Sequence, residues 1–106
     1  MEDNQNLNIL EEAVNLAKTL DRSNIKWAFI GGVAVGIHGY IRATEDIDII
    51  IAPERFSHFI NNRIGGKFGE NKIYVISKED LIAMKKNSGR KQDLLDVEKL
   101  DNINEQ

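Results

Sequence analysis

The sequence predicts a single α/β (or α+β) domain in which helices flank a small sheet of roughly three strands. Short apolar runs rich in strand formers occur at residues 25–30, 46–52 and 72–76, and segments with helical periodicity lie between them. The length of 106 residues is that of one ordinary domain. Because no repeat, low-complexity tract or linker interrupts the pattern, we expect residues 1–106 to form one domain.

The N-terminal third predicts a helix followed by a strand. Apolar residues recur every three or four positions across residues 6–21, as in an amphipathic helix. The run IKWAFI at residues 25–30 predicts the first strand, with Trp27 in the core, and Gly31 and Gly32 end it.

The middle of the chain predicts two further helices around the second strand. The small apolar segment VAVGIHGY predicts a short helix broken near Gly39, and residues 54–64 alternate as a helix would. Pro53 ends the strand between them, and the glycine-rich residues 65–69 predict a loop before the third strand.

Two helices are expected after the third strand. Ser77 begins an S-x-x-D capping pattern, and Gly89 interrupts the helix that follows. A last helix is expected to end near Asn102, with its apolar positions at Leu94, Leu95, Val97 and Leu100. Three strands are few for such a domain, so we expect an exposed sheet edge or completion of the sheet by a second subunit.

Composition excludes several classes of protein. With 42% hydrophobic and 29% charged residues, the chain is expected to be globular rather than disordered or fibrous. A net charge of -3 gives no general attraction to nucleic acid or to an anionic membrane, and the absence of cysteine excludes disulfides and thiolate metal sites. No apolar run is long enough to span a membrane, and the acidic start lacks the order of a signal peptide, so we expect a cytoplasmic protein.

Two carboxylates lie inside the most hydrophobic segment of the chain, DIDIII. Because side chains alternate along a strand, Asp46 and Asp48 are expected to share one face, and Ile47, Ile49 and Ile51 to point into the core. Two carboxylates on one strand face suit Mg²⁺ (or Mn²⁺), which binds one or two carboxylates together with waters and phosphate oxygens.

Residues just upstream of these carboxylates suit a phosphate. Gly31 and Gly32 would let backbone N–H groups approach it closely, at the start of a helix. Arg42 and Thr44 offer a guanidinium and a hydroxyl as further donors. A phosphate cradle, an arginine and a metal-binding strand within so short a stretch favour binding of a metal–nucleoside triphosphate.

Each of these features also has an ordinary structural explanation. Paired glycines are common in turns, and two aspartates on an edge strand can simply be solvated. The segment is not a G-x-G-x-x-G fingerprint, and no Walker lysine follows it. His38 is expected to be a hydrogen-bonded structural histidine and His58 a solvated one, since neither has a partner at metal-ligand spacing.

The pattern GG-x-A-x-x-x-HG-x-x-R-x-T-x-DID resembles the signature of the DNA polymerase β-like nucleotidyltransferase superfamily. The nearest branch is that of the minimal nucleotidyltransferases and the AbiEii-type toxins. The residues that fit the pattern are Gly31, Gly32, Ala34, His38, Gly39, Arg42, Thr44, Asp46, Ile47 and Asp48. The C-terminal segment also resembles the end of these proteins, at Lys85, Arg90, Asp93 and Asp96.

The resemblance implies a nucleotidyltransferase-like core, a toxin–antitoxin setting and a set of roles. Asp46 and Asp48 would be the catalytic metal ligands for Mg²⁺ or Mn²⁺. Members of the family transfer a nucleoside monophosphate from a triphosphate to a hydroxyl acceptor, here on a protein or an RNA. The nucleotide would contact Gly31, Gly32, Arg42, Thr44, Lys85 and Arg90. A charged helix end is the ordinary alternative for Lys85 and Arg90, and a helix N-terminus for Asp93 and Asp96.

The sequence departs from the family pattern at one point. Active members carry a third carboxylate on a later strand, whereas the strand at residues 72–76 contains no acid and Glu70 and Glu79 only flank it. Three interpretations therefore stay open. One is a protein that binds Mg–NTP with weakened transfer, and another is an inactive remnant acting as a homodimeric interaction module. The third is an enzyme to which a second subunit supplies the missing carboxylate.

Overall fold

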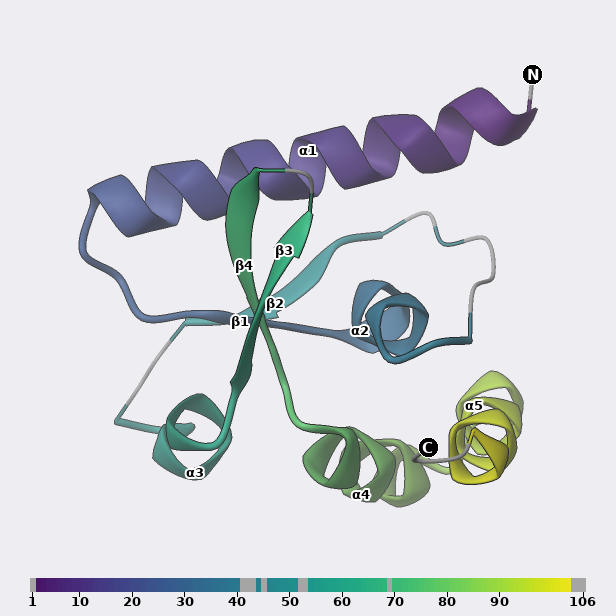
Figure 1. Cartoon of the computed structure of the whole chain (residues 1–106). Coiled ribbons are helices and arrows are strands. Elements are labelled where there is room, and N and C mark those ends of the chain that lie inside the picture. The colour runs from purple at the N-terminus through teal and green to yellow at the C-terminus, as the bar shows by residue number, and fades with distance from the viewer. Residues whose placement is uncertain (1, 41–43, 45, 52–53, 69, 104–106) are drawn as a thin grey trace.

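The computed structural model describes residues 2–40, 44, 46–51, 54–68 and 70–103 (Figure 1). The order of its elements is α1 (Glu2–Arg22), β1 (Ala28–Ile30), α2 (Gly31–Ile37), β2 (Asp48–Ile50), α3 (Ser57–Asn61), β3 (Ile64–Phe68), β4 (Asn71–Val75), α4 (Lys78–Ser88) and α5 (Lys91–Asn102). This mixed α/β arrangement, with helices around a small sheet, is the fold class that the sequence predicts.

The sheet contains four strands in the order β2-β1-β4-β3 among the described residues. Strand β1 pairs antiparallel with β2 and parallel with β4, while β3 and β4 form an antiparallel hairpin. The C-terminal ends of β1 and β4 therefore lie along the same side of the sheet, the edge at which these two strands end. The first residue of β2 lies there too, because Asp48 pairs with Ile30 at the end of β1.

The expected loop at residues 65–69 is wrong where the structure describes it, because Gly65 and Gly66 belong to β3. Pairing with β4 outweighs the poor strand propensity of glycine. Gly65 lies opposite Tyr74, and the position of its missing side chain is 3.7 Å from the ring, so the aromatic side chain covers the glycine. Gly69 lies outside the described residues.

Two hydrophobic clusters lie on opposite faces of the sheet. The larger one joins α1, α2, α4 and α5 to Trp27, just before β1, and to strand residues that include Phe29 and Val75. The smaller one places Ala28 and Ile50 against α3. In Figure 1, α1 and α3 accordingly lie on opposite sides of the strands. Trp27 is 1% exposed, which confirms its expected place in the core.

The helix boundaries follow local capping chemistry. Ser77 caps α4 by accepting a hydrogen bond from the Asp80 N–H at 3.1 Å, as its S-x-x-D pattern predicts. Gly89 ends the same helix in the left-handed conformation, with φ of 70°. Helix α3 is shorter than residues 54–64, since Ile64 pairs with Val75 in the sheet instead.

The buried face of α5 differs from the expected one. Leu94 and Leu95 are 49% and 41% exposed, whereas Asp93, Asp96, Val97 and Leu100 are buried. The face of α5 that packs against the core therefore includes two acids. The apolar periodicity of the sequence predicted the wrong buried face for the first turn of this helix. The side chain of Lys85, on α4, makes this orientation possible by supplying a cation for both acids. No helix among the described residues combines the length and the apolarity needed to cross a membrane.

Candidate functional site

The two halves of the opening motif meet at one edge of the sheet. Ile30 pairs with Asp48 in the antiparallel ladder, and the chain passes directly from Ile30 into Gly31, the first residue of α2. The start of α2 and the start of β2 are thus neighbours in space although 17 positions separate Gly31 from Asp48 in the sequence.

Gly31 lies in direct contact with the Asp48 side chain. A Cβ added to Gly31 would overlap Asp48 Oδ2 and would lie 3.0 Å from Asp48 Cβ. Gly31 also has φ of +67°, in the left-handed region that favours glycine. The positive φ favours glycine here, and the overlap shows that the Asp48 carboxylate occupies the space that a side chain would fill.

Asp46 and Asp48 are exposed, although the surrounding sequence is the most apolar of the chain. Asp48 begins β2 at the edge of the core, and two residues later Ile50 is buried against α3. The desolvation cost that a buried carboxylate would carry therefore does not arise. Asp46 precedes the strand instead of belonging to it, because β2 is shorter than residues 46–52.

The three isoleucines that were expected to point into the core from this segment do so only in part. Ile47 and Ile49 pack against the larger cluster. Ile51 is 46% exposed, so its expected place in the core is wrong. The physical reason is that β2 ends at Ile50, and Ile51 no longer belongs to the paired strand.

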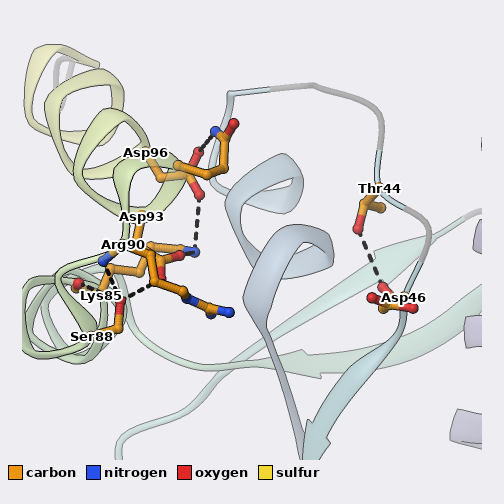
Figure 2. Close-up of polar contacts among 8 residues, drawn as sticks. Thr44, Asp46, Lys85, Ser88, Arg90, Asp93 and Asp96 are labelled. Atoms are coloured by element: carbon orange, nitrogen blue, oxygen red, sulfur yellow. Dashed lines mark hydrogen bonds and ion pairs between the residues drawn. The ribbon is translucent and has the colours of Figure 1, made fainter.

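The other residues expected at the phosphate are described in part. Gly32 is partly exposed in the first turn of α2. The Thr44 hydroxyl donates a hydrogen bond to the carbonyl oxygen of Asp46 at 3.3 Å, which shapes the approach to β2 (Figure 2). Arg42 lies outside the described residues.

The donor set suits a cation that brings its own ligands. No group of three or more His, Cys, Asp or Glu side chains that could hold a metal occurs within the part of the chain that the structure describes. Two exposed carboxylates nevertheless match Mg²⁺, which takes its other ligands from water and phosphate. Strand β4 contains no acid, and Glu70, which precedes it, lies at the opposite edge of the sheet from Asp48.

Lys85, from the C-terminal group of expected site residues, lies in a buried charge cluster between α4 and α5. Its Nζ is 2.9 Å from Asp93 Oδ1 and 3.0 Å from Asp96 Oδ2. The three side chains are 7%, 8% and 0% exposed, respectively. Because both of these contacts are internal, Lys85 holds the two last helices together.

The cluster is completed by polar neighbours. Ser88 Oγ donates a short hydrogen bond to Asp93 Oδ2, and Arg90 Nε donates to the same oxygen at 2.9 Å. Gln92 Nε2 donates to Asp96 Oδ1 at 2.8 Å. Sequence reasoning missed Ser88 and Gln92; their spacing of three or four residues from Lys85 and Asp96 on the same helices was the available signal. Arg90, with a side chain 80% exposed, is the member that faces solvent.

The pKa of Asp93 reflects these contacts. Burial by itself would raise the pKa, but the hydrogen bonds from Ser88, Lys85 and Arg90 outweigh burial and lower it from 3.8 to about 2. A lowered carboxyl pKa contributes stability that is fully present above the ordinary value of 3.8 and is lost as pH falls through about 2.

We therefore expect acid to weaken the native state more than it weakens an Asp93→Asn variant. Between pH 5 and pH 2 the wild type should lose about 2 kcal/mol more than the variant, the energy equivalent of the pKa shift. Urea unfolding at a series of pH values measures this difference. Asp101→Asn, at an exposed position of α5, should follow the wild-type curve. Parallel curves for wild type and Asp93→Asn would contradict this role of Asp93.

We call the region around Gly31, Asp46 and Asp48, at the starts of α2 and β2, the carboxylate edge. It is separate from the charge cluster. In the view of Figure 2, α2 lies between the cluster on α4 and α5 and the pair Thr44 and Asp46. His38, just after α2, donates from Nε2 to the carbonyl oxygen of Ile76 at 2.7 Å, so it is hydrogen-bonded as expected. His58 is 68% exposed and pairs with Asp80 at 3.0 Å on the surface.

Comparison of the chain with protein-family models and with curated proteins finds no match. A functional assignment therefore depends on the geometry of the carboxylate edge and on the resemblance in residues 31–48.

Proposed function

We propose that the protein binds a Mg²⁺– or Mn²⁺–nucleoside triphosphate at the edge of the sheet formed by Gly31, Asp46 and Asp48. The observation that carries this proposal is that the Asp48 side chain occupies the space at the Cβ position of Gly31. A carboxylate of one half of the motif thus lies next to a glycine of the other half. Both aspartates are exposed, so a cation reaches them without opening the core.

The residues around this edge have complementary roles in the proposal. Asp46 and Asp48 would hold the metal, whose chemistry is to neutralise the phosphate oxygens and polarise the reacting one. Gly31 and Gly32 allow the phosphate chain to approach the backbone closely. Arg42 and Thr44, which precede β2, would supply donors. Lys85 and Arg90, the other cations expected at the nucleotide, contact carboxylates of the charge cluster, and Lys85 would have to break two ion pairs to bind a phosphate.

Transfer of the nucleoside monophosphate to a hydroxyl of a protein or an RNA is the reaction that the resemblance adds. Two carboxylates can hold a metal–triphosphate, but activation of the acceptor oxygen is the task of the third carboxylate in active members. No described residue of β4 offers one. We therefore propose nucleotide binding as the main property and transfer as a slower one.

Replacing both carboxylates tests the proposal. Calorimetric titration of the four NTPs with Mg²⁺ should show binding to the wild type. In Asp46→Asn/Asp48→Asn the affinity should fall at least tenfold, which corresponds to about 1.4 kcal/mol. Glu11→Gln/Glu12→Gln, which removes the same charge from the exposed face of α1, is the matched control and should bind as the wild type does. Unchanged Mg²⁺-dependent binding in the double asparagine variant would refute the proposal.

The homodimeric interaction module is a second candidate, and the edge strand β3 favours it. No described strand pairs with the outer side of β3, Ile64 is 46% exposed, and Gly66 has nothing near its Cβ position. Such an edge is a template for pairing with another chain. We expect light scattering to show a dimer that Ile64→Lys disrupts and Leu94→Lys, on α5, does not. A wild type that stays monomeric at high concentration would exclude this candidate.

A further inference from the structure

A pocket of about 200 Å³ lies at the other end of β1, between the end of α1, the segment that leads into β1, and the hairpin β3–β4. It is lined by Asp21, Asn24, Ile25, Lys26, Trp27, Arg63 and Tyr74. Trp27 precedes β1 and Gly31 follows it, so four residues of extended chain, or about 13 Å, separate the pocket from the carboxylate edge. The pocket is therefore distinct from the proposed nucleotide site.

Arg63 supplies the main charge of the pocket, and its hydrogen bonding is incomplete. Its Nη1 donates to the carbonyl oxygen of Ile60 at 2.8 Å, and its Cζ lies 4.2 Å from the centre of the Tyr74 ring. The Nε is buried and has no hydrogen-bond partner among the residues that the structure describes. A buried donor on a guanidinium without an acceptor is costly, so an anion entering the pocket would bring the guanidinium an acceptor that it lacks.

The surroundings of Arg63 are positively charged. Lys26 lines the same pocket, and Lys72 Nζ lies 5.2 Å from the centre of the Tyr74 ring. Among the described residues, the lining has one acid, Asp21, which accepts a hydrogen bond from Trp27 Nε1 at 2.9 Å. The two cations of the lining, Arg63 and Lys26, therefore outnumber its described carboxylate, and Lys72 adds a third positive charge next to Tyr74.

The pKa of the Tyr74 hydroxyl reflects these positive charges. Its pKa is lowered, first by the hydrogen bond with Lys72 and further by the charges of Lys72 and Arg63, against the raising effect of burial. The same environment that favours a phenolate favours any small anion placed beside it.

We propose that this pocket binds a small oxyanion, with phosphate as the ligand group and Arg63 and Lys26 as its cationic donors. The size fits this assignment, because pockets that enclose drug-sized molecules have volumes of about 300–1,000 Å³. Only the phosphate of a nucleotide would therefore enter the pocket, and its sugar and base would stay outside.

Trp27 makes the proposal directly testable. It is the single tryptophan of the chain and lines the pocket, so its fluorescence reports on the ligand. Titration of the full chain with inorganic phosphate, in EDTA, should give a saturable change that sodium chloride at equal ionic strength does not reproduce. Parallel titrations with acetate and with AMP identify the ligand. Tighter binding of phosphate indicates free phosphate and tighter binding of AMP indicates a phosphomonoester, whereas tighter binding of acetate would overturn the assignment of phosphate.

Three variants show whether the anion binds in this pocket or elsewhere on the protein surface. Arg63→Gln should raise the half-saturating phosphate concentration at least tenfold, the equivalent of losing one charged hydrogen bond. Lys26→Gln, at an exposed position, should weaken binding without changing the melting temperature, so the test remains decisive if Arg63→Gln is unstable. Lys67→Gln, an exposed lysine of β3 outside the pocket lining, should bind as the wild type does.

A second readout uses Tyr74 itself. In a Tyr40→Phe background, the ultraviolet titration of the remaining tyrosine should show its pKa rising when phosphate is bound, because the anion offsets the two cations. The Asp46→Asn/Asp48→Asn variant should retain phosphate binding whether or not the nucleotide proposal holds. Absence of a saturable signal, equal affinity in Lys26→Gln and wild type, or loss of binding in the double asparagine variant would each overturn the proposal.

Discussion

Replacing Lys85 by methionine is expected to lower the free energy of unfolding by about 3–5 kcal/mol, the usual cost of removing one partner from a buried ion pair. Lys85 is the cation that both Asp93 and Asp96 contact, and Asp96 is fully buried. Without the ammonium group, two carboxylates would remain close together in the interior. Since domains of this size are stable by about 5–15 kcal/mol, the variant should be marginally folded. Urea unfolding followed by circular dichroism measures the change.

The neighbouring lysine provides the control. Lys86→Met alters the same type of side chain at an exposed position of α4 and should change stability by no more than about 0.5 kcal/mol. Asp96→Leu combined with Lys85→Met should cost less than the two single changes together, because the double variant no longer buries the Lys85–Asp96 pair. Strict additivity in this cycle, or equal midpoints for Lys85→Met and Lys86→Met, would show that the cluster contributes little.

Gly31→Ala is expected to affect both stability and the proposed site. A residue with a Cβ at φ of +67° costs about 1–2 kcal/mol, since the left-handed region disfavours L side chains. The added methyl would also require the Asp48 carboxylate to turn away, because its Oδ2 occupies the space at the Cβ position. An exposed side chain moves at little cost in stability, so this second effect should appear in ligand affinity. We expect Mg²⁺–NTP affinity, measured by calorimetric titration, to fall at least tenfold, or about 1.4 kcal/mol.

Gly36 of the same helix gives a control of opposite sign. No described residue lies near its Cβ position, and alanine is the better helix former by about 0.5–1 kcal/mol. Gly36→Ala should therefore stabilise the protein and leave nucleotide affinity unchanged. If Gly31→Ala bound Mg²⁺–NTP as tightly as Gly36→Ala, the contact between Gly31 and Asp48 would have no part in binding.

The elements with strong local signals were predictable from the sequence. Helix α4 shows why, because Ser77 and Gly89 define its two ends through chemistry that involves only nearby residues. Strand β3 was not predictable in this way. Its glycines resemble a loop, and only the partner strand β4, with Tyr74 over Gly65, makes the segment a strand.

The candidate site residues also divide into those that sequence spacing predicted and those whose contacts depend on the fold. Spacing alone pointed to Asp46, Asp48, Gly31 and Gly32, and the structure brings Asp48 and Gly31 into contact. The environment of Lys85 was not available from spacing, since the acids that surround it lie on the next helix. For the same reason the apolar pattern of α5 gave Leu94 an inward position that Asp93 occupies.

The mixed pairing of β1 has a consequence for the order of folding. Its partner β4 is far along the chain, with Phe29 aligned to Val75, whereas the hairpin β3–β4 and the helices α4 and α5 connect nearby residues. Closing a long loop costs more entropy than forming a hairpin, and contacts between neighbours in sequence form faster. The second half of the chain should therefore assemble first and serve as the surface on which β1 docks. The proposed oxyanion pocket would then be completed only in that last step, because it joins residues that precede β1 to Arg63 and Tyr74 of the second half.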